Sequence, residues 1–295
     1  MSALKFLLFL ITVISVSVIF HQQTALFVLN SIAHFGHYQQ YKDINYAENQ
    51  QKLDIYITNN LTVEEVSKRP TVIFFYGGCW GACSQLDKTD YRFIAQTLTD
   101  NEINTVIIDY RKFPQVKFPS IISDAAESVE WVTKNISRYG GNPNNIYLMG
   151  HSAGAHIASM LNFNKTYLTE NTYKNIKGFI GLAGAYDFLP FDESYQPALF
   201  DPPENYYQSQ TINFVTGNEP ASLLMHGSND TRVKRRNIES LSKKIKTMKG
   251  KVETRIYNNV DHISIVSSLS IPFRSTKPIL SDILKFINQT DNLSQ

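Results

Sequence analysis

The stretch that decides the fold reads IYLMGHSAG and spans residues 146–154 of the 295-residue chain. Residues 146–149 form an apolar run typical of a strand, and GHSAG (residues 150–154) is a G-x-S-x-G pattern. Residues 155–161, AHIASML, are typical of a helix. Glycines flank the serine because backbone segments approach closely at a sharp strand-to-helix turn. The pattern predicts that Ser152 is a nucleophile projecting above a sheet; the alternative is a plain Gly/Ser turn.

Apolar runs and helix-forming segments alternate on both sides of this stretch. Eight runs predict strands, at Asp43–Tyr46, Leu53–Ile57, Thr71–Tyr76, Asn104–Tyr110, Ile146–Met149, Gly178–Leu182, Ser222–Met225 and Val252–Tyr257. Helices are predicted between them, at Asp87–Thr99, Ser123–Tyr139, Ala153–Leu161, Arg236–Met248 and Leu280–Asn288. Strands that alternate with helices favour an α/β fold with a mostly parallel sheet and helices on both faces.

A serine nucleophile needs a base and an acid, which follow it along the chain in the order acid, then histidine, when the serine lies on this kind of turn. Of the seven histidines, His262 follows the last predicted strand and fits that order. Asp230 lies in the loop after the strand predicted at 222–225, at the sheet edge where catalytic groups collect. Asp187, after the preceding strand, is the competing acid.

A glycine-containing loop follows the strand predicted at 71–76. Small residues there allow backbone N–H groups to turn toward an anion. We expect the N–H groups of Gly78, Cys79 and Ala153 to form an oxyanion hole, whereas the alternative is an ordinary βα loop. Trp80 is either a wall of the substrate pocket or a core residue.

Together these motifs resemble the carboxylesterase/lipase type of α/β-hydrolase, near the hormone-sensitive-lipase-like and BD-FAE-like esterases. The resemblance covers residues 41–290. Its matching segments are Lys52-Leu53-Asp54-Ile55-Tyr56, Tyr76-Gly77-Gly78-Cys79-Trp80, Asp109-Tyr110-Arg111 with Phe118-Pro119, Gly150–Gly154, His226-Gly227-Ser228-Asn229-Asp230 and Asp261-His262. It implies an α/β-hydrolase fold and ester hydrolysis through an acyl-enzyme on Ser152, with Asp230 and His262 as partners. We expect no cofactor and no metal, because the sequence contains no metal motif such as H-E-x-x-H and no phosphate loop.

Two features of the loop depart from this family. The usual motif is His-Gly-Gly, and Tyr76 stands in place of the histidine, where its hydroxyl is a candidate for orienting the loop. Cys79 and Cys83 are the only cysteines of the chain. They either form a small disulfide that braces the loop in an exported domain, or remain reduced.

The irregular stretch Phe188–Asn218 interrupts the alternation and predicts a short cap segment. It is rich in aromatic residues, which suit the wall of an acyl pocket, but it has no long apolar helix to cover a lipid-sized opening. We therefore expect short to medium acyl esters as substrates. An arylformamidase or an acyltransferase on the same triad, or a non-catalytic hydrolase-like binding protein, is the alternative, because such proteins share one scaffold.

Charge and composition limit the classes of partner that we expect this protein to bind. With 28 Lys and Arg against 26 Asp and Glu, the net charge is +2, so nucleic-acid binding has little electrostatic basis. Small-molecule esters are the expected partners, and the sequence does not indicate an oligomeric state. The chain has 295 residues, of which 43% are hydrophobic. A chain of this length can bury a hydrophobic core without a disulfide framework.

The N-terminus carries a separate signal. Residues 4–20 form an apolar run with Lys5 as its single charge, which predicts a signal peptide or an N-terminal membrane anchor over residues 1–20. We therefore expect an exported or membrane-anchored protein, with possible membrane association through this segment. Residues 21–40 are expected to be a linker that contains an amphipathic helix between Thr24 and Phe35.

Overall fold

The structure is a computed structural model, and it describes residues 26–48, 51–59, 62–66 and 68–292. Its centre is an eight-stranded sheet with the strand order β1-β2-β4-β3-β5-β6-β7-β8. The strands are β1 (Tyr38–Asn45), β2 (Lys52–Thr58), β3 (Thr71–Phe75), β4 (Asn104–Ile108), β5 (Ile146–His151), β6 (Ile176–Leu182), β7 (Ala221–Gly227) and β8 (Val252–Tyr257). β1 and β2 pair antiparallel and β2 pairs antiparallel with β4, whereas the other pairs are parallel. The predicted mostly parallel sheet is confirmed.

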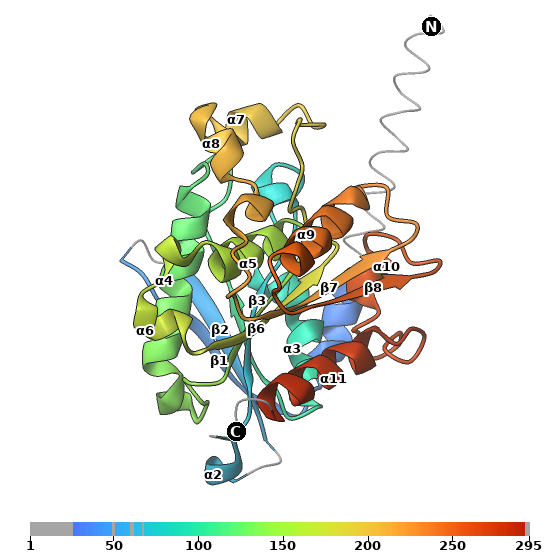
Figure 1. The fold of residues 1–295 in the computed structure, drawn as a ribbon. Helices are drawn as coiled ribbons and strands as arrows, with labels where there is room; N and C mark the ends of the chain where they lie inside the picture. The colour runs from blue at the N-terminus through green and yellow to red at the C-terminus, as the bar shows by residue number, and fades with distance from the viewer. Residues whose placement is uncertain (1–25, 49–50, 60–61, 67, 293–295) are drawn as a thin grey trace, which may run out of the picture.

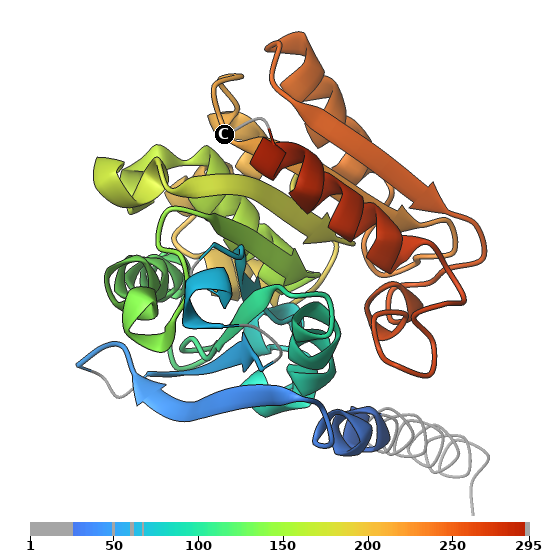
Figure 2. The ribbon, with the colours of Figure 1, turned by 90° about the horizontal axis from the view of Figure 1, so that it is seen from below.

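Helices cover both faces of this sheet (Figure 1). α4 (Ser120–Asn135) packs on α5 (Ala153–Phe163), which contacts β3, β5 and β6. α3 (Arg92–Thr99) and α11 (Ile279–Asn292) pack against strands too, and they lie across the sheet from α4 (Figure 2). β3, β4 and β5 are buried along their whole length, as expected for central strands with helices on both faces. This burial places the end of β5, and Ser152 after it, at the centre of the molecule.

The predicted cap segment consists of three short helices near the top of Figure 1. They are α7 (Gln196–Phe200), α8 (Glu204–Gln208) and the 3-10 helix η5 (Thr211–Phe214). Phe188 and Phe200 are buried in an aromatic cluster with Trp80, at ring-centre distances of 5.3–5.9 Å. The aromatic residues of this segment therefore pack largely on one another and on the loop after β3.

The N-terminal part of the described chain is a helix over residues 26–33 that leads into β1. Leu29 and Ala33 are buried, and the Asn30 side chain donates to the carbonyl oxygen of Asp90 (2.7 Å). β1 begins at Tyr38, inside the predicted linker. Residues 4–20 lie outside the described residues, and among the residues described no helix has the length and apolar composition needed to cross a bilayer.

A buried lysine joins the antiparallel edge of the sheet to the loop region near the nucleophile. The Nζ atom of Lys88 lies 2.8 Å from a carboxylate oxygen of Asp43 and 3.4 Å from one of Asp54. Burial opposes its charge, but the carboxylates outweigh burial and raise the pKa of Lys88. The Lys88 backbone N–H also donates to Asp109 (2.8 Å), which accepts the Tyr76 hydroxyl (2.8 Å). The end of β3 is thereby fixed.

Replacing this lysine should destabilise the fold. Lys88→Met leaves the carboxylate of Asp54, whose side chain is 2% exposed, without its cation. We expect a loss of about 3–5 kcal/mol in the free energy of unfolding, measured by urea denaturation. The matched control is Lys68→Met, which removes an exposed pair with Glu64 and should cost less than about 1 kcal/mol. Equal losses in the two variants would show that the Asp54 site rehydrates at little cost.

Candidate active site

Ser152 lies between β5 and α5 in a strained backbone conformation. Its φ and ψ angles are 57° and −122°, a left-handed φ that L residues rarely adopt. The turn closes tightly on both sides: a Cβ on Gly150 would overlap the backbone of Gly154, and a Cβ on Gly154 would overlap the carbonyl oxygen of Phe75. Only glycine fits at these two positions. The predicted strand–turn–helix geometry around the serine is present.

The structure brings Ser152, His262 and Asp230 into one hydrogen-bonded line. The Oγ atom of Ser152 lies 2.9 Å from Nε2 of His262, and Nδ1 of His262 lies 2.8 Å from Oδ2 of Asp230. A carboxylate only accepts, so Nδ1 carries the proton and Nε2 is left as the acceptor for the serine hydroxyl. This is the tautomer that a general base requires.

Parallel pairing of β5 to β8 explains why residues so distant in sequence meet. Asp230 follows β7 and His262 follows β8, so both loops leave the same edge of the sheet as Ser152. The side chain of Asp230 is fixed by the backbone N–H groups of Arg232 (2.9 Å) and Val233 (3.0 Å).

Asp230 is held in its ionised form. Burial alone would raise the pKa of this carboxyl. The hydrogen bond and the charge of His262, together with the Val233 N–H, outweigh burial and lower the pKa below its ordinary value. The competing acid, Asp187, does not join this line: its backbone N–H donates to Asn237 (2.9 Å), and His262 bonds to Asp230 instead.

The loop after β3 reaches the nucleophile. A Cβ on Gly77 would lie 3.1 Å from the Cβ of Ser152. Gly78, Cys79 and Trp80 have φ angles of 107°, 55° and 56°, so the backbone turns sharply at successive residues. Within the part of the chain that the structure describes, the N–H groups of Gly78, Cys79 and Ala153 donate to no protein acceptor. These are the donors that sequence reasoning assigned to an oxyanion hole.

A disulfide between Cys79 and Cys83 closes this loop on itself. The sequence left the reduced and the bridged forms open, and the structure contains the bridged form. The bridge holds the backbone of Cys79, which carries one of the three unpartnered N–H groups. Tyr76, which replaces the family's usual histidine, anchors the other end of the loop through Asp109, and its carbonyl oxygen accepts the hydroxyl of Tyr110 (2.9 Å).

Two buried histidines support the site, and sequence reasoning had not assigned them a role. Nε2 of His151 donates to the backbone carbonyl of His262 (2.8 Å), which fixes the segment that carries the base. Nε2 of His156 donates to the carbonyl of Ser209 (2.7 Å) in the cap, and its Nδ1 accepts the indole N–H of Trp80 (3.1 Å). Burial lowers the pKa of His151 to about 3 and that of His156 to about 4, so both are neutral near pH 7.

Trp80 itself is 4% exposed. Its ring packs edge-on against Phe200 and against His156, and it lies tilted against Phe188. Most of its surface is therefore in contact with protein. Part of this contact between Trp80, His156 and the cap can be seen in the sequence, because His156 lies one helical turn after Ser152 and the aromatic residues gather in one segment. Which of these side chains contact one another depends on the tertiary fold.

Comparison with known proteins shows which family the chain is similar to. The BD-FAE family model matches residues 53–245, which is more than half of the chain. Isoprenylcysteine alpha-carbonyl methylesterase from Arabidopsis thaliana is 28% identical over 265 residues, covering 82% of this chain and 60% of that protein. Kynurenine formamidase from Danio rerio is 26% identical over 241 residues, covering 78% of this chain and 77% of that protein.

Solved structures show the same fold. A truncated form of a carbohydrate esterase from gut microbiota superposes with a TM-score of 0.73 at 17% identity, covering 88% of this chain and 98% of that one. The strand order, the turn at Ser152 and the family match agree with one another. The chain therefore belongs to the BD-FAE family, and its fold is that of the α/β-hydrolases.

Proposed function

We propose that this protein is a serine hydrolase that cleaves carboxylic esters through an acyl-enzyme on Ser152. The observation that carries the proposal is the hydrogen-bonded line from Ser152 through His262 to Asp230, beside three unpartnered backbone N–H groups. A nucleophile, a base, an orienting carboxylate and an oxyanion hole are the parts that acyl transfer needs.

The geometry supports each step of the reaction. Nε2 of His262 accepts the hydroxyl proton of Ser152 while Oγ bonds to the ester carbonyl carbon. The imidazolium, stabilised by the Asp230 carboxylate, then gives its proton to the leaving alkoxide as the carbon–oxygen bond breaks. Water repeats the sequence on the acyl-enzyme: it loses a proton to His262, attacks the acyl carbon, and releases the acid and Ser152.

The carbonyl oxygen gains negative charge in both halves of the reaction. We expect the N–H groups of Gly78, Cys79 and Ala153 to receive that charge. Each such donor typically contributes about 3 kcal/mol to transition-state stabilisation. Because these groups have no protein acceptor to release, they need no rearrangement when the charge develops.

The substrate class follows from the surroundings of Trp80. This residue follows Cys79 directly and bonds to His156, one turn of α5 from Ser152, so the aromatic cluster lies beside the nucleophile. The cluster is already filled by its own rings, which limits the room for an acyl chain along it. We infer a preference for short to medium acyl groups.

Amide-like substrates are the second candidate. The similarity to the formamidase of Danio rerio extends over 78% of this chain, and the similarity to the plant methylesterase extends over 82%. The match covers only 60% of the methylesterase's own length. Ester and formamide hydrolysis share the same triad chemistry, so an assay panel with phenyl acetate and N-formylaniline separates them. The ester proposal predicts the higher kcat/KM for the acetate.

One prediction concerns the triad. Ser152→Ala and His262→Ala should each lower kcat by roughly a million-fold, and Asp230→Asn by roughly ten-thousand-fold. The double variant Ser152→Ala/His262→Ala should be no worse than either single variant, because the residues act as a unit. Steady-state hydrolysis of p-nitrophenyl acetate measures all four.

The matched control is Asp187→Asn, a neighbouring carboxylate outside the hydrogen-bonded line, which should keep wild-type kcat. Thermal unfolding of each variant checks that the fold is intact. Turnover in Ser152→Ala comparable to wild type would refute the proposed nucleophile. An active Asp230→Asn beside an inactive Asp187→Asn would move the role of the acid to Asp187.

A separate prediction concerns the disulfide. Without the bridge, the three successive left-handed residues at 78–80 lose a covalent restraint, and the Cys79 N–H is less well placed. We expect Cys79→Ser/Cys83→Ser to lower kcat about tenfold, or about 1.4 kcal/mol, with little change in KM. A dithiol reductant should have the same effect on the wild type and none on the double variant. Unchanged kcat in both would show that the loop holds its shape without the bridge.

Substrate size gives a further test. Across p-nitrophenyl esters from acetyl to palmitoyl, each methylene that fits should gain about 0.8 kcal/mol, or about fourfold in kcat/KM, until the pocket ends. Phe191→Ala, in the partly buried rim of the aromatic cluster, should shift the optimum to longer chains. Continued increase through palmitoyl, or a jump in rate at a lipid–water interface, would contradict the short-acyl proposal. An identical profile in Phe191→Ala would remove the cluster from substrate selection.

A further inference from the structure

The helix of residues 26–33 is apolar on both of its faces. Its inner face buries Leu29 and Ala33 against the domain. Its outer face carries Phe27, 72% exposed, and Ile32, 37% exposed. A helix on the surface of a soluble domain normally turns polar residues outward, and one that is apolar all round is covered by protein or by lipid.

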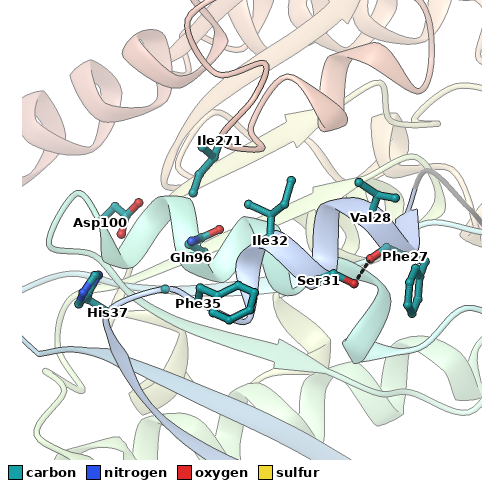
Figure 3. Close-up of a pocket in the computed structure, with 10 residues that line it drawn as sticks. Phe27, Val28, Ser31, Ile32, Phe35, His37, Gln96, Asp100 and Ile271 are labelled. Carbon is teal, nitrogen blue, oxygen red and sulfur yellow. Dashed lines mark hydrogen bonds between the residues drawn. The ribbon is translucent and has the colours of Figure 1, made fainter.

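Other apolar side chains lie beside this outer face and line the same depression (Figure 3). We define the apolar patch as Phe27, Val28, Ile32, Phe35 and Ile271. These five residues line one shallow depression together with Ser31, Gly36, His37, Gln96 and Asp100. Ser31, the polar residue of the helix's outer face, donates its hydroxyl to the carbonyl oxygen of Phe27 (2.7 Å). His37, Gln96 and Asp100 lie toward one end of the depression, and Ser31 lies between Phe27 and Phe35 (Figure 3).

The position of the patch along the chain indicates what covers it. The helix begins at residue 26, and the apolar run of residues 4–20 precedes it by residues 21–25. Five residues span at most about 18 Å when fully extended. If residues 4–20 are inserted in a bilayer, the start of the helix, with Phe27, is tethered within that distance of the membrane surface. Polar groups also lie at the depression: Asp100 lines it and forms an ion pair with Arg274 (2.9 Å).

We propose that the apolar patch is a membrane-docking surface: it rests in the interfacial layer of the bilayer that holds residues 4–20. Phe27 and Phe35 then enter the boundary between headgroups and acyl chains, as on helices that lie in the membrane plane. The domain is held against the membrane at two points, the inserted segment and the patch, and so has a fixed orientation. This proposal is independent of the catalytic role of Ser152.

The test uses the full-length chain reconstituted in phosphatidylcholine vesicles. Cys79 and Cys83 are bridged and are the only native cysteines, so an introduced cysteine is the single reactive thiol for an environment-sensitive fluorophore. The probe sites are Phe27→Cys and Ile271→Cys. The control site is Glu170→Cys, on the exposed surface of α6 (Glu170–Tyr173), at the opposite side of the molecule (Figure 1).

We expect spin-labelled lipid to quench the probes at 27 and 271 several-fold more than the probe at 170, and aqueous iodide to show the reverse order. Equal iodide quenching at the three sites would overturn the proposal. Shielding of residue 27 that depends on protein concentration, without quenching by spin-labelled lipid, would also overturn it and identify a second copy of this chain as the occupant.

A second variant separates docking from anchoring. Phe27 and Phe35 are 72% and 81% exposed, so Phe27→Glu/Phe35→Glu should leave the fold intact. In this background the protein should stay with the vesicles through residues 4–20, while the probe at Ile271→Cys loses its lipid quenching. Retained quenching at 271 would show that the inserted segment alone sets the orientation and that the patch does not dock.

Discussion

The close approach of α5 to the end of β3 is the constraint on which the site depends. A Cβ on Gly154 would overlap the carbonyl oxygen of Phe75, and a Cβ on Gly150 would overlap the backbone of Gly154. With both side chains absent, the chain can turn through the left-handed conformation of Ser152. The same contact brings Gly77 beside Ser152, so the proposed nucleophile and the proposed oxyanion donors lie together.

Hydrogen bonding separates one histidine from the others around this turn. His151 donates to a backbone carbonyl and His156 uses both ring nitrogens, and burial keeps the pKa values of both low. Burial outweighs the attraction of the Asp230 carboxylate for a proton on His151, and for His156 it outweighs the hydrogen bond to Ser209. His262 alone in this group faces a hydroxyl at one nitrogen and a carboxylate at 2.8 Å from the other. This pair of contacts is why we propose His262 as the base.

Sequence patterns predicted the strands, the sheet and the line of Ser152, Asp230 and His262, because these depend on local periodicity and on motifs that need particular residues at particular steps. They did not predict that His156 joins Trp80 to Ser209, since that contact spans 53 residues and depends on how the cap folds back. The helix between Thr24 and Phe35 was predicted as amphipathic. Its outer face is apolar. Only the burial of Leu29 and Ala33 in the folded domain shows which face of the helix points inward and which points outward.

Hydrogen bonds also connect the N-terminal helix with the loop that carries the oxyanion donors. Asn30 donates to the carbonyl of Asp90, at the end of a 3-10 turn whose Lys88 N–H holds Asp109. Asp109 in turn accepts the hydroxyl of Tyr76, immediately before Gly77. Each link is short and partly buried, so displacement of the helix is opposed by the same bonds that hold the loop. If the domain is tethered through residues 26–33, as we propose, these bonds connect the tethering helix to the candidate active site.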